Sequence, residues 1–284
     1  AVVYLLLVFH SIVLMNFGYW SQPVGPVMAL LMAGGSGAAV VSLLRKVGAR
    51  RRALGAITEL VHHPDNRVLK VAVKLQDRWP GHDAGQFAFV TFDPREGAHP
   101  FTIASAPGAC GQAADGAERL RLVIKPLGDY TQQLHQQLQV GHSVRIEGPY
   151  GRFDGQGVQE RQQVWIAGGV GVTPFIALLE ARQPGAPAAQ AGAAPAVLHY
   201  CTRAAAKDGV LPRIQALAAS AQPPVELIVH DAEKNQYFRP QDLLRHGKAL
   251  DIWLCGPAGL GQAVREQAQR EAGWHLHQEA FQLR

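Results

Sequence analysis

The sequence predicts a membrane helical hairpin in residues 1–46, followed by an antiparallel β-barrel in residues 53–155 and an α/β doubly wound domain in residues 160–284. Three observations support this architecture. Residues 1–44 contain no Lys, Arg, Asp or Glu. Short strand-like segments separated by Gly and Pro then follow, a pattern typical of small antiparallel barrels. From Arg161 onwards, strand-like and helix-like segments alternate, as they do in doubly wound parallel sheets.

The first part has the length and composition of a membrane segment. Residues 24–44 are long enough to cross a bilayer, which takes roughly 20 apolar residues. Residues 1–15 form a shorter stretch without an initiating Met, so we expect the C-terminal part of a longer membrane protein, cut inside a helix. The basic cluster that begins at Arg45 and Lys46 predicts that the later domains lie on the cytoplasmic side of an inner or plasma membrane. A buried hairpin of a soluble domain is the alternative.

His10 lies inside the first apolar stretch. An ionisable side chain at membrane depth is a functional candidate, and the role that we predict for it is that of a haem-iron ligand. A histidine that hydrogen-bonds a neighbouring helix is an equally good interpretation of the sequence.

The composition excludes several classes of function. The formal net charge is +5, but no basic stripe with interleaved aromatic residues is present, so we expect no nucleic-acid binding. The three cysteines, Cys110, Cys201 and Cys255, are far apart in the sequence. This spacing excludes a CxxC zinc site and an iron–sulfur cluster held by four cysteines of this chain, and we expect free thiols.

The barrel and the last part are predicted element by element. Residues 53–63 and 67–75 alternate apolar and polar side chains on either side of the turn at residues 64–66, which indicates a hairpin. Further barrel strands are expected at residues 86–93, 120–125 and 143–147, with a helix at residues 131–138. In the last part, strands are expected at residues 164–167, 197–201, 225–229, 251–255 and 275–281, and helices at residues 211–219, 241–245 and 258–272.

Two glycine-containing turns follow strands of the last part. Residues 168–174 lead from a strand into a helix, where glycines let the backbone approach a pyrophosphate and the helix N-terminus favours its charge. Residues 255–257 follow a later strand. Because ligands of open parallel sheets bind beyond the carboxyl ends of the strands, we expect both turns to face one cleft. A tight strand–helix connection without a ligand is the alternative for the first turn.

The barrel contains an unusual run, HPFTIAS, which offers an imidazole at His99, an aromatic ring at Phe101 and a hydroxyl at Thr102. In an extended segment, His99 and Phe101 share one face and Thr102 lies on the other. A flavin needs such partners, to cover its ring and to contact its polar edge and its phosphates. Lys125 and residues 128–131 add a cation and a Gly-led helix start, which suit a second phosphate contact.

Six short motifs, in this order, resemble the ferredoxin–NADP reductase superfamily over nearly the whole chain. They are HPFTIASAP at 99–107, GDYT at 128–131, GPYG at 148–151, AGGVGVTPF at 167–175, CGP at 255–257 and EAF at 279–281. The HPFT form, joined to a preceding membrane hairpin, resembles the ferric reductase and NADPH oxidase branch. The resemblance implies an FAD-binding barrel and an NAD(P)H-binding α/β domain.

The resemblance also implies a role for each matching residue. Thr102 would hydrogen-bond the flavin edge near N5, and Phe101 would pack on one face of the isoalloxazine. Phe281 would cover the other face and move aside for the nicotinamide. His99 would lie near the FAD phosphates, and Cys255 would lie near the nicotinamide.

The remaining roles follow in the same way. Residues 128–131 would hold the FAD pyrophosphate, and residues 168–174 would cradle the nicotinamide nucleotide. His10 would match a haem-binding histidine whose partner ligands lie elsewhere, so the remainder of a membrane haem domain is an expected partner. The residues predicted to bind cofactors are His99, Pro100, Phe101, Thr102, Lys125, Gly128, Tyr130, Thr131, Gly168, Gly169, Val170, Gly171, Val172, Thr173, Pro174, Arg203, Cys255, Gly256, Pro257 and Phe281, and the residues predicted to act in catalysis are Thr102, Cys255 and Phe281.

Three of these residues have a plain structural alternative. Phe101 is also suited to the barrel core, Cys255 is also suited to a small buried position, and Phe281 is also suited to anchoring the last strand.

The nucleotide preference depends on three residues. Arg203 follows a strand that no Asp or Glu ends, and an arginine suits a 2′-phosphate, with Lys207 as a second cation. Asp231 ends the next strand, where a carboxylate suits the ribose diol of NADH. The sequence therefore favours NADPH and leaves NADH open.

The predicted activity is a membrane-bound flavin oxidoreductase that takes hydride from NAD(P)H onto FAD and passes single electrons across the membrane through haem. Ferric iron is the favoured acceptor and dioxygen, reduced to superoxide, is the alternative. A reductase that feeds an oxygenase is disfavoured because no ferredoxin cysteines are present. A membrane-tethered flavin or nucleotide sensor without turnover is the alternative from another class.

Overall fold

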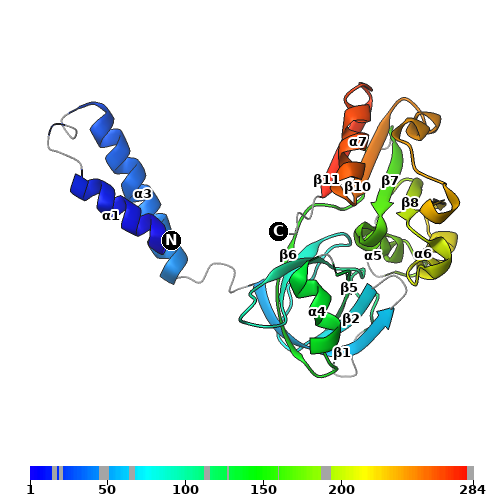
Figure 1. The fold of residues 1–284 in the computed structure, drawn as a ribbon, viewed down its shortest axis with the longest axis horizontal. Coiled ribbons are helices and arrows are strands. Elements are labelled where there is room, and N and C mark those ends of the chain that lie inside the picture. The colour runs from blue at the N-terminus through cyan, green and yellow to red at the C-terminus, as the bar shows by residue number, and fades with distance from the viewer. Residues whose placement is uncertain are drawn as a thin grey trace. The chain divides into compact units, whose positions relative to one another are not determined.

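The computed structural model describes residues 1–14, 18, 22–44, 51–63, 68–111, 116–126, 128–158, 160–186 and 193–279 (Figure 1). It divides into two compact units, Ala1–Arg51 and Arg52–Arg284. The cluster that begins at Arg45 and Lys46 and the predicted site residue Phe281 lie largely or wholly outside the described residues.

The first unit is a pair of apolar helices, α1 (Val2–Leu14) and α3 (Val24–Leu44), which pack against each other. A side chain on Gly35 would collide with the Tyr4 hydroxyl, so this glycine lets α1 approach α3 closely. Helix α3 buries only Gly25 and Ala39. By length and composition, α3 is the one helix among the described residues that is suited to crossing a bilayer.

The second unit begins with a six-stranded antiparallel sheet, in the order β4-β3-β6-β1-β2-β5. The strands are β1 (Arg52–His63), β2 (Val68–Leu75), β3 (Phe87–Thr91), β4 (His99–Thr102), β5 (Arg119–Ile124) and β6 (Ser143–Tyr150), and α4 (Asp129–Gln137) lies between β5 and β6 in the chain. A bridge between Ile103 and Leu122 joins the two outer strands. The sheet therefore closes on itself, as the sequence predicts for a small barrel.

The barrel core follows the alternation of the strands. In β2, the side chains that point inward are buried and those between them are half-buried. Val71 and Val73 of β2, Ile57 of β1 and Ile146 of β6 meet inside the barrel with at most 1% of their surface exposed. This period of two is what a sheet with one buried face requires.

A five-stranded parallel sheet follows, in the order β11-β10-β7-β8-β9. Its strands are β7 (Gln162–Gly168), β8 (Ala196–Thr202), β9 (Val225–Asp231), β10 (Leu250–Cys255) and β11 (Trp274–Glu279). Its helices are α5 (Thr173–Ala181), α6 (Leu211–Ser220) and α7 (Ala258–Ala268), and short 3₁₀ turns are η2 (Gly169–Val172), η3 (Ala205–Lys207), η4 (Ala232–Lys234) and η5 (Pro240–His246). The antiparallel sheet followed by a parallel α/β sheet confirms that part of the predicted fold class.

Two helix predictions differ from the structure. The helix expected at 258–272 ends at Ala268, because the chain turns at Gln269 and Arg270 before it enters β11 at Trp274. The helix expected at 241–245 is a 3₁₀ segment, η5, which begins at Pro240. Both are errors of element ends or helix type, which short apolar periodicity does not resolve.

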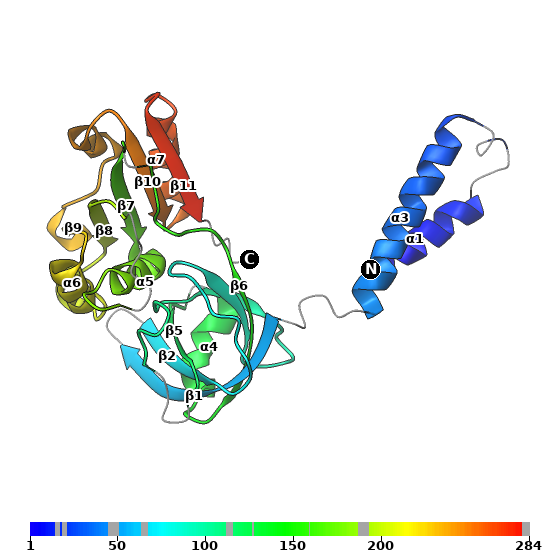
Figure 2. The same ribbon diagram turned by 180° about the vertical axis from the view of Figure 1, so that it is seen from behind.

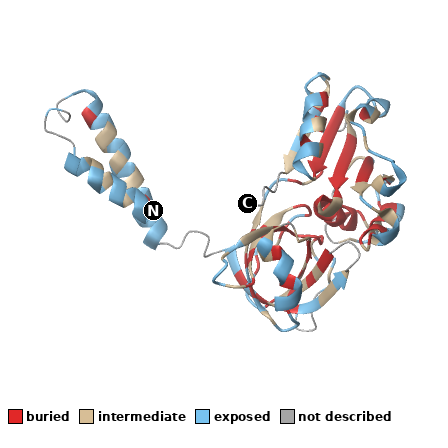
Figure 3. Cartoon of the chain, viewed as in Figure 1, coloured by how far each residue is buried: buried red, intermediate tan, exposed pale blue. Residues whose placement is uncertain are grey.

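Helix α5 lies between the barrel and the parallel sheet in both views (Figures 1 and 2). All nine of its residues are buried, and it is red along its length in Figure 3. One apolar cluster runs from Ala84, Ala104 and Val123 of the barrel through Phe175 and Leu178 of α5 into the parallel sheet. The two sheets therefore share a continuous core rather than a wet interface.

Candidate functional site

A cleft of about 590 Å³ lies between the barrel and the carboxyl ends of β7, β8 and β10. Strand order reverses at β7, because β8 and β9 lie on one side of it and β10 and β11 on the other. Open parallel sheets bind their ligands at such a point. The cleft is lined by Pro100, Phe101, Thr102, Val123, Ile124, Lys125 and Thr131 from the barrel part, and by Gly168, Gly169, Val170, Gly171, Thr173, Cys201, Thr202, Arg203, Ala232, Tyr237, Phe238, Cys255, Gly256, Pro257, Ala258, Leu260 and Glu279 from the sheet part.

The structure brings most of the predicted site residues into this one cleft. Five predicted residues of the second unit, His99, Gly128, Tyr130, Val172 and Pro174, are not part of its lining. His10 belongs to the first unit, and Phe281 lies outside the described residues.

The two glycine turns meet backbone to backbone. A side chain on Gly171 would collide with the carbonyl of Cys255, and a side chain on Gly168 would press on Pro257. Gly169 has a φ of +55°, in the left-handed region that glycine tolerates best. The glycines therefore serve two purposes, because they let the loops after β7 and β10 touch and leave their backbone facing the cleft.

The side chain of Lys125 extends from the barrel wall of the cleft to the glycine turn of the opposite wall. It follows β5 of the barrel, and its Nζ lies 3.6 Å from where a Cβ would stand on Gly169. An ammonium group beside a glycine turn that leads into a helix favours an anion between them. The sequence prediction paired this cation with Gly128. The structure instead shows it beside the turn at residues 168–171.

His99 stacks on Tyr130 at the start of α4, with ring centroids 4.2 Å apart and 17° between the planes. The Nε2 atom of His99 is buried and has no hydrogen-bond partner among the described residues. At the first turn of α4, the Gly128 N–H donates to Thr131 Oγ1 at 3.1 Å. An unsatisfied imidazole nitrogen beside a helix start is suited to an anionic ligand.

Phe101 and Thr102 lie at the end of β4 and are 9% and 7% exposed. The Phe101 ring packs edge-on against Phe92 at a centroid distance of 6.0 Å, inside the barrel core. Phe101 therefore has the packing of the structural alternative while it also borders the cleft. Thr102 lies opposite Phe87 in the pairing of β3 with β4 and borders the cleft from the other face of the strand.

Cys255 and Glu279 end neighbouring strands in register, and both border the cleft. Burial raises the pKa of the Cys255 thiol to about 12, and the Glu279 carboxylate adds to the shift. The thiol is therefore neutral at physiological pH and is not a nucleophile.

Glu279 is a site residue that the sequence reasoning missed, although its motif was recognised. Burial raises the pKa of the Glu279 carboxyl to about 7, and its Oε2 is buried without a partner among the described residues. The signal available in the sequence was an acidic residue at the carboxyl end of the last strand of a parallel sheet.

The far end of the cleft is formed by Arg203 after β8 and by Tyr237 and Phe238 after β9. Tyr237 is 61% exposed, which is high for an aromatic side chain next to a cleft. Asp231 is 3% exposed, and its carboxylate accepts the Glu233 N–H at 3.1 Å. Asp231 therefore caps its own turn, whereas Arg203 faces the cleft.

A chain of three histidines lies behind Phe238. His199 contacts His230 through Nδ1 at 3.0 Å and His246 through Nε2 at 2.9 Å. Arg245 Nε also donates to His246 Nε2, at 3.3 Å. Burial and the neighbouring His230, His246 and Arg245 lower the pKa of His199 to about 3. His199 is thus neutral at physiological pH, and its ring lies 5.2 Å from that of Phe238.

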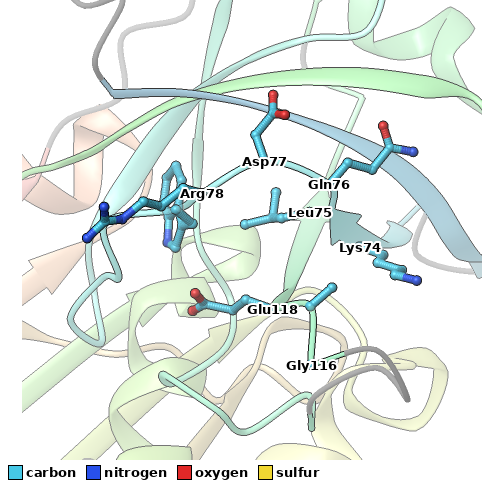
Figure 4. Close-up of a pocket in the computed structure, with 9 residues that line it drawn as sticks. Lys74, Leu75, Gln76, Asp77, Arg78, Gly116 and Glu118 are labelled. Atoms are coloured by element: carbon cyan, nitrogen blue, oxygen red, sulfur yellow. The ribbon is translucent and has the colours of Figure 1, made fainter.

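A second hollow, of about 660 Å³, lies at the end of β2 and is shown in Figure 4. It is lined by Lys74, Leu75, Gln76, Asp77, Arg78, Trp79, Gly116, Ala117 and Glu118. Its charges are of both signs, and Asp77 already accepts the Leu54 N–H at 2.9 Å. It contains none of the predicted site residues. We therefore place the candidate site in the cleft.

The described residues contain no group of three or more His, Cys, Asp or Glu side chains that is arranged to hold a metal ion. His10 is exposed on α1. This single imidazole does not make a haem site within the described part of the first unit.

Comparison with known proteins gives a family match in the barrel and several related proteins. Residues 56–154 match the model of an FAD-binding domain family. The chain is 30% identical to the vanillate O-demethylase oxidoreductase of Pseudomonas putida over 175 residues, which are 58% of this chain and 51% of that protein. It is 31% identical to NADPH oxidase 1 of Mus musculus over 130 residues, 44% of this chain and 20% of that protein. It is 35% identical to ferric reduction oxidase 2 of Arabidopsis thaliana over 86 residues, 28% of this chain and 11% of that protein.

Solved structures match over most of the chain. The cytochrome b5 reductase domain of Ulva prolifera nitrate reductase aligns with a TM-score of 0.61 and 18% identity, over 80% of this chain and 98% of that one. The FAD/NAD-binding domain of the nitric oxide dioxygenase from Vibrio cholerae aligns with a TM-score of 0.60 and 21% identity, over 80% and 98%. These structures share the fold, and the chain spans about half or less of the length of the three curated relatives named above. Residues 56–154 thus match an FAD-binding domain family, the chain is similar to oxidoreductases that include an NADPH oxidase and a ferric reduction oxidase, and its second unit shares the fold of solved FAD/NAD-binding reductase domains.

Proposed function

We propose that this chain binds FAD on its barrel, residues 53–155, and NADPH on its α/β part, residues 160–284. It would pass electrons from NADPH to FAD and from FAD to ferric iron. One observation carries the proposal. The cleft brings Thr102 of the barrel, the glycine turn at 168–171 and Cys255 together in a single cavity. A cofactor on the barrel and a nucleotide on the parallel sheet would meet there.

The residues of the barrel side fit FAD. His99 Nε2 is buried without a partner in the described part of the chain, and the first turn of α4 lies next to it, which together suit the phosphates. Bound FAD would supply the acceptance of a hydride and the release of electrons one at a time. The protein contributes position and polarity. Thr102 would donate to the polar edge of the ring, and Pro100 and Phe101 would shield it from water.

The residues of the sheet side fit a nicotinamide nucleotide. The backbone at residues 168–171 is open to a pyrophosphate, with Lys125 as its counter-charge. Cys255, a neutral thiol, would form a small wall beside the nicotinamide. Glu279 Oε2 has no partner among the described residues, and the pKa of its carboxyl is about 7, so near neutrality it would exchange between accepting and donating a hydrogen bond. Phe281 as a mobile cover of the flavin remains a prediction from the sequence.

NADPH is favoured over NADH because of the residues at the far end of the cleft. Arg203 borders the cleft there, where its guanidinium suits a 2′-phosphate. The competing carboxylate, Asp231, is committed to its own turn. Tyr237 offers an exposed ring for the adenine.

The membrane part of the proposal rests on α1 and α3. Leu30 and Leu44 of α3 are 75% and 78% exposed, and apolar helices of this kind need lipid or other helices around them. The basic cluster that follows α3 in the sequence supports a cytoplasmic position for the catalytic part. His10 would contribute one ligand of a haem whose other ligands come from other segments.

Ferric iron and dioxygen are the two acceptors that the named relatives suggest, through ferric reduction oxidase 2 and NADPH oxidase 1. We favour ferric iron, and superoxide formation is the second candidate.

The test uses the full chain in detergent with added FAD. We expect anaerobic NADPH to bleach the flavin absorbance rapidly, NADH to do so more slowly, and a ferric chelate to restore the absorbance faster than dissolved dioxygen. An FAD-loaded protein that neither nucleotide bleaches would favour the sensor interpretation. Faster reoxidation by dioxygen, with superoxide as product, would replace ferric iron by the second candidate.

A further inference from the structure

Glu180 is a charged side chain inside the apolar region that joins the two sheets. It lies near the end of α5, and 4% of its surface is exposed. The apolar cluster around α5 contains Ala104, Ala106 and Val123 from the barrel part. A carboxylate in such surroundings persists only when donors satisfy it.

Three donors satisfy the Glu180 carboxylate, and two of them come from the barrel part. Arg121 of β5 donates through Nη1 to Oε1 at 2.6 Å. The Ala106 N–H donates to Oε2 at 3.1 Å. Arg213 of α6 donates to Oε1 from within the α/β part. Both carboxylate oxygens of Glu180 therefore accept hydrogen bonds from the barrel. Oε1 also accepts one from the α/β part, to which Glu180 itself belongs.

Three of the four elements that meet at Glu180 have their other end in the cleft, and α6, which carries Arg213, does not. The segment that contains Ala106 begins at Thr102, and β5 leads directly to Lys125. Helix α5 begins at Thr173, next to the glycine turn. The Arg121 N–H also donates to Ser105 Oγ at 3.1 Å, which ties the two barrel segments to each other. A movement at Glu180 would therefore change the spacing of the two cleft walls.

We infer that Glu180 is a positioning residue, which sets the distance between the flavin wall at Thr102 and the nucleotide wall at residues 168–173. This inference rests on the proposed function, because the distance matters only if a hydride crosses it. Charge-assisted hydrogen bonds are short and directional, and the apolar packing around them supplies attraction without fixing direction. A displacement of about 1 Å in reacting groups lowers a rate by up to about a hundredfold.

The variants compare the Arg121–Glu180 ion pair, which joins the barrel to the α/β part, with an ion pair that lies within the barrel. Glu180→Gln keeps the shape but replaces one acceptor oxygen by an NH2 group that opposes a donor. Glu180→Asp keeps the charge and shortens the reach, and Arg121→Lys removes the fork from the barrel side. The control is Glu147→Gln, which breaks the Arg52–Glu147 pair, also 2.6 Å long but confined to the barrel.

Three measurements on the full chain separate positioning from folding. The first is the rate constant of flavin reduction at saturating NADPH. The second is the FAD dissociation constant together with flavin reduction by dithionite, a small reductant that needs no nucleotide wall. The third is amide hydrogen exchange of residues 103–111 in the FAD-free protein, since the Ala106 N–H is bound to Glu180.

For Glu180→Gln we expect NADPH to reduce the flavin at least tenfold more slowly, with FAD binding and dithionite reduction within twofold of wild type and faster exchange at residues 103–111. Arg121→Lys and Glu180→Asp should show the same pattern with smaller changes, and Glu147→Gln should show none of it. If Glu180→Gln does not fold, Arg121→Lys decides the question by the same three measurements.

The inference is overturned if NADPH reduces the Glu180→Gln flavin within twofold of the wild-type rate. It is also overturned if FAD affinity falls as much as the rate, since that is the pattern of a merely structural residue. Failure of the proposed function itself is distinguishable, because then NADPH does not reduce the wild-type flavin either. In that case unchanged exchange at residues 103–111 in Glu180→Gln would reject the linkage at Glu180 independently.

Discussion

The barrel wall of the cleft and the parallel-sheet wall present different chemistry. From the barrel come side chains, among them Thr102 and Lys125. The parallel sheet adds exposed backbone at Gly168, Gly171 and Gly256 to side chains such as Arg203 and Cys255. The difference follows from geometry, because a barrel strand turns alternate side chains to its surface, whereas the carboxyl end of a parallel strand presents a turn. Changes to the sheet wall should therefore be less tolerated than changes to the barrel wall.

The largest effect is expected for Gly171→Val. A side chain there collides with the Cys255 carbonyl, so the two loops must separate. We expect flavin reduction by NADPH to slow about a hundredfold or more and the free energy of unfolding to fall by about 1–3 kcal/mol, with FAD still bound. Stopped-flow absorbance and thermal melting measure the two effects.

The matched control is Gly259→Ala in α7, where a Cβ meets nothing within 4 Å. It should leave the rate unchanged and stabilise the helix by up to about 1 kcal/mol. Equal rates in Gly171→Val and wild type would remove the distinction between the two walls.

Arg203→Ala sharpens the comparison at a position where the sheet wall offers a cationic side chain. Loss of a charge-assisted contact costs about 1.5–3 kcal/mol, so the dissociation constant for NADPH should rise about tenfold to a hundredfold, and that for NADH should stay within twofold. Equilibrium titration of the flavoprotein measures both constants. Arg270→Ala, on the exposed surface after α7, should change neither, and an equal loss for both nucleotides would contradict a 2′-phosphate contact.

Thr102→Val tests the barrel wall. It removes a hydroxyl and keeps the branched shape, so the rate of flavin reduction should fall up to about tenfold, in line with the loss of one neutral hydrogen bond, while FAD binding changes little. The control is Thr58→Val, an exposed threonine of β1. A Thr102→Val protein with a wild-type rate would show that the barrel wall contributes only shape.

The smallest expected effect concerns pH. Burial raises the pKa of the Glu279 carboxyl from 4.5 to about 7. A raised folded-state pKa means that its favourable contribution is complete below about pH 4.5 and is lost as the pH rises through about 7. Glu279→Gln should therefore melt higher than wild type at pH 8 by more than it does at pH 5. A melting difference that does not change between pH 5 and pH 8 would show that Glu279 titrates normally.

The sequence predicted the glycine turns that border the cleft better than it predicted the buried acidic side chains near them. Glycine turns at the ends of strands can be recognised locally, so Gly168, Gly171 and Gly256 were found from their spacing. Glu279 was missed because its burial depends on β11 pairing with β10, which no local pattern specifies. Glu180 was missed because its donors, Arg121 and Ala106, lie 59 and 74 residues away.

Phe101 was recognised from its motif, but the sequence did not reveal how its ring packs. Its motif predicted a ring against the flavin, and the structure also packs it on Phe92 in the barrel core. Periodicity assigns a residue to a face of a strand, but it does not say whether the neighbours leave that ring free.

The apolar cluster around α5 has a consequence for modularity. Because Ala104 and Val123 of the barrel and Phe175 of α5 belong to one core, the two sheets should melt in a single transition, and FAD bound to the barrel should stabilise the nucleotide half as well. At a hundred times its dissociation constant, a ligand adds about 2.7 kcal/mol to the whole cooperative unit. A chimaera that exchanges the α/β part with that of a relative would need to carry α5 and its barrel contacts together. The sequence boundary between the barrel and the α/β part does not separate two independently stable cores.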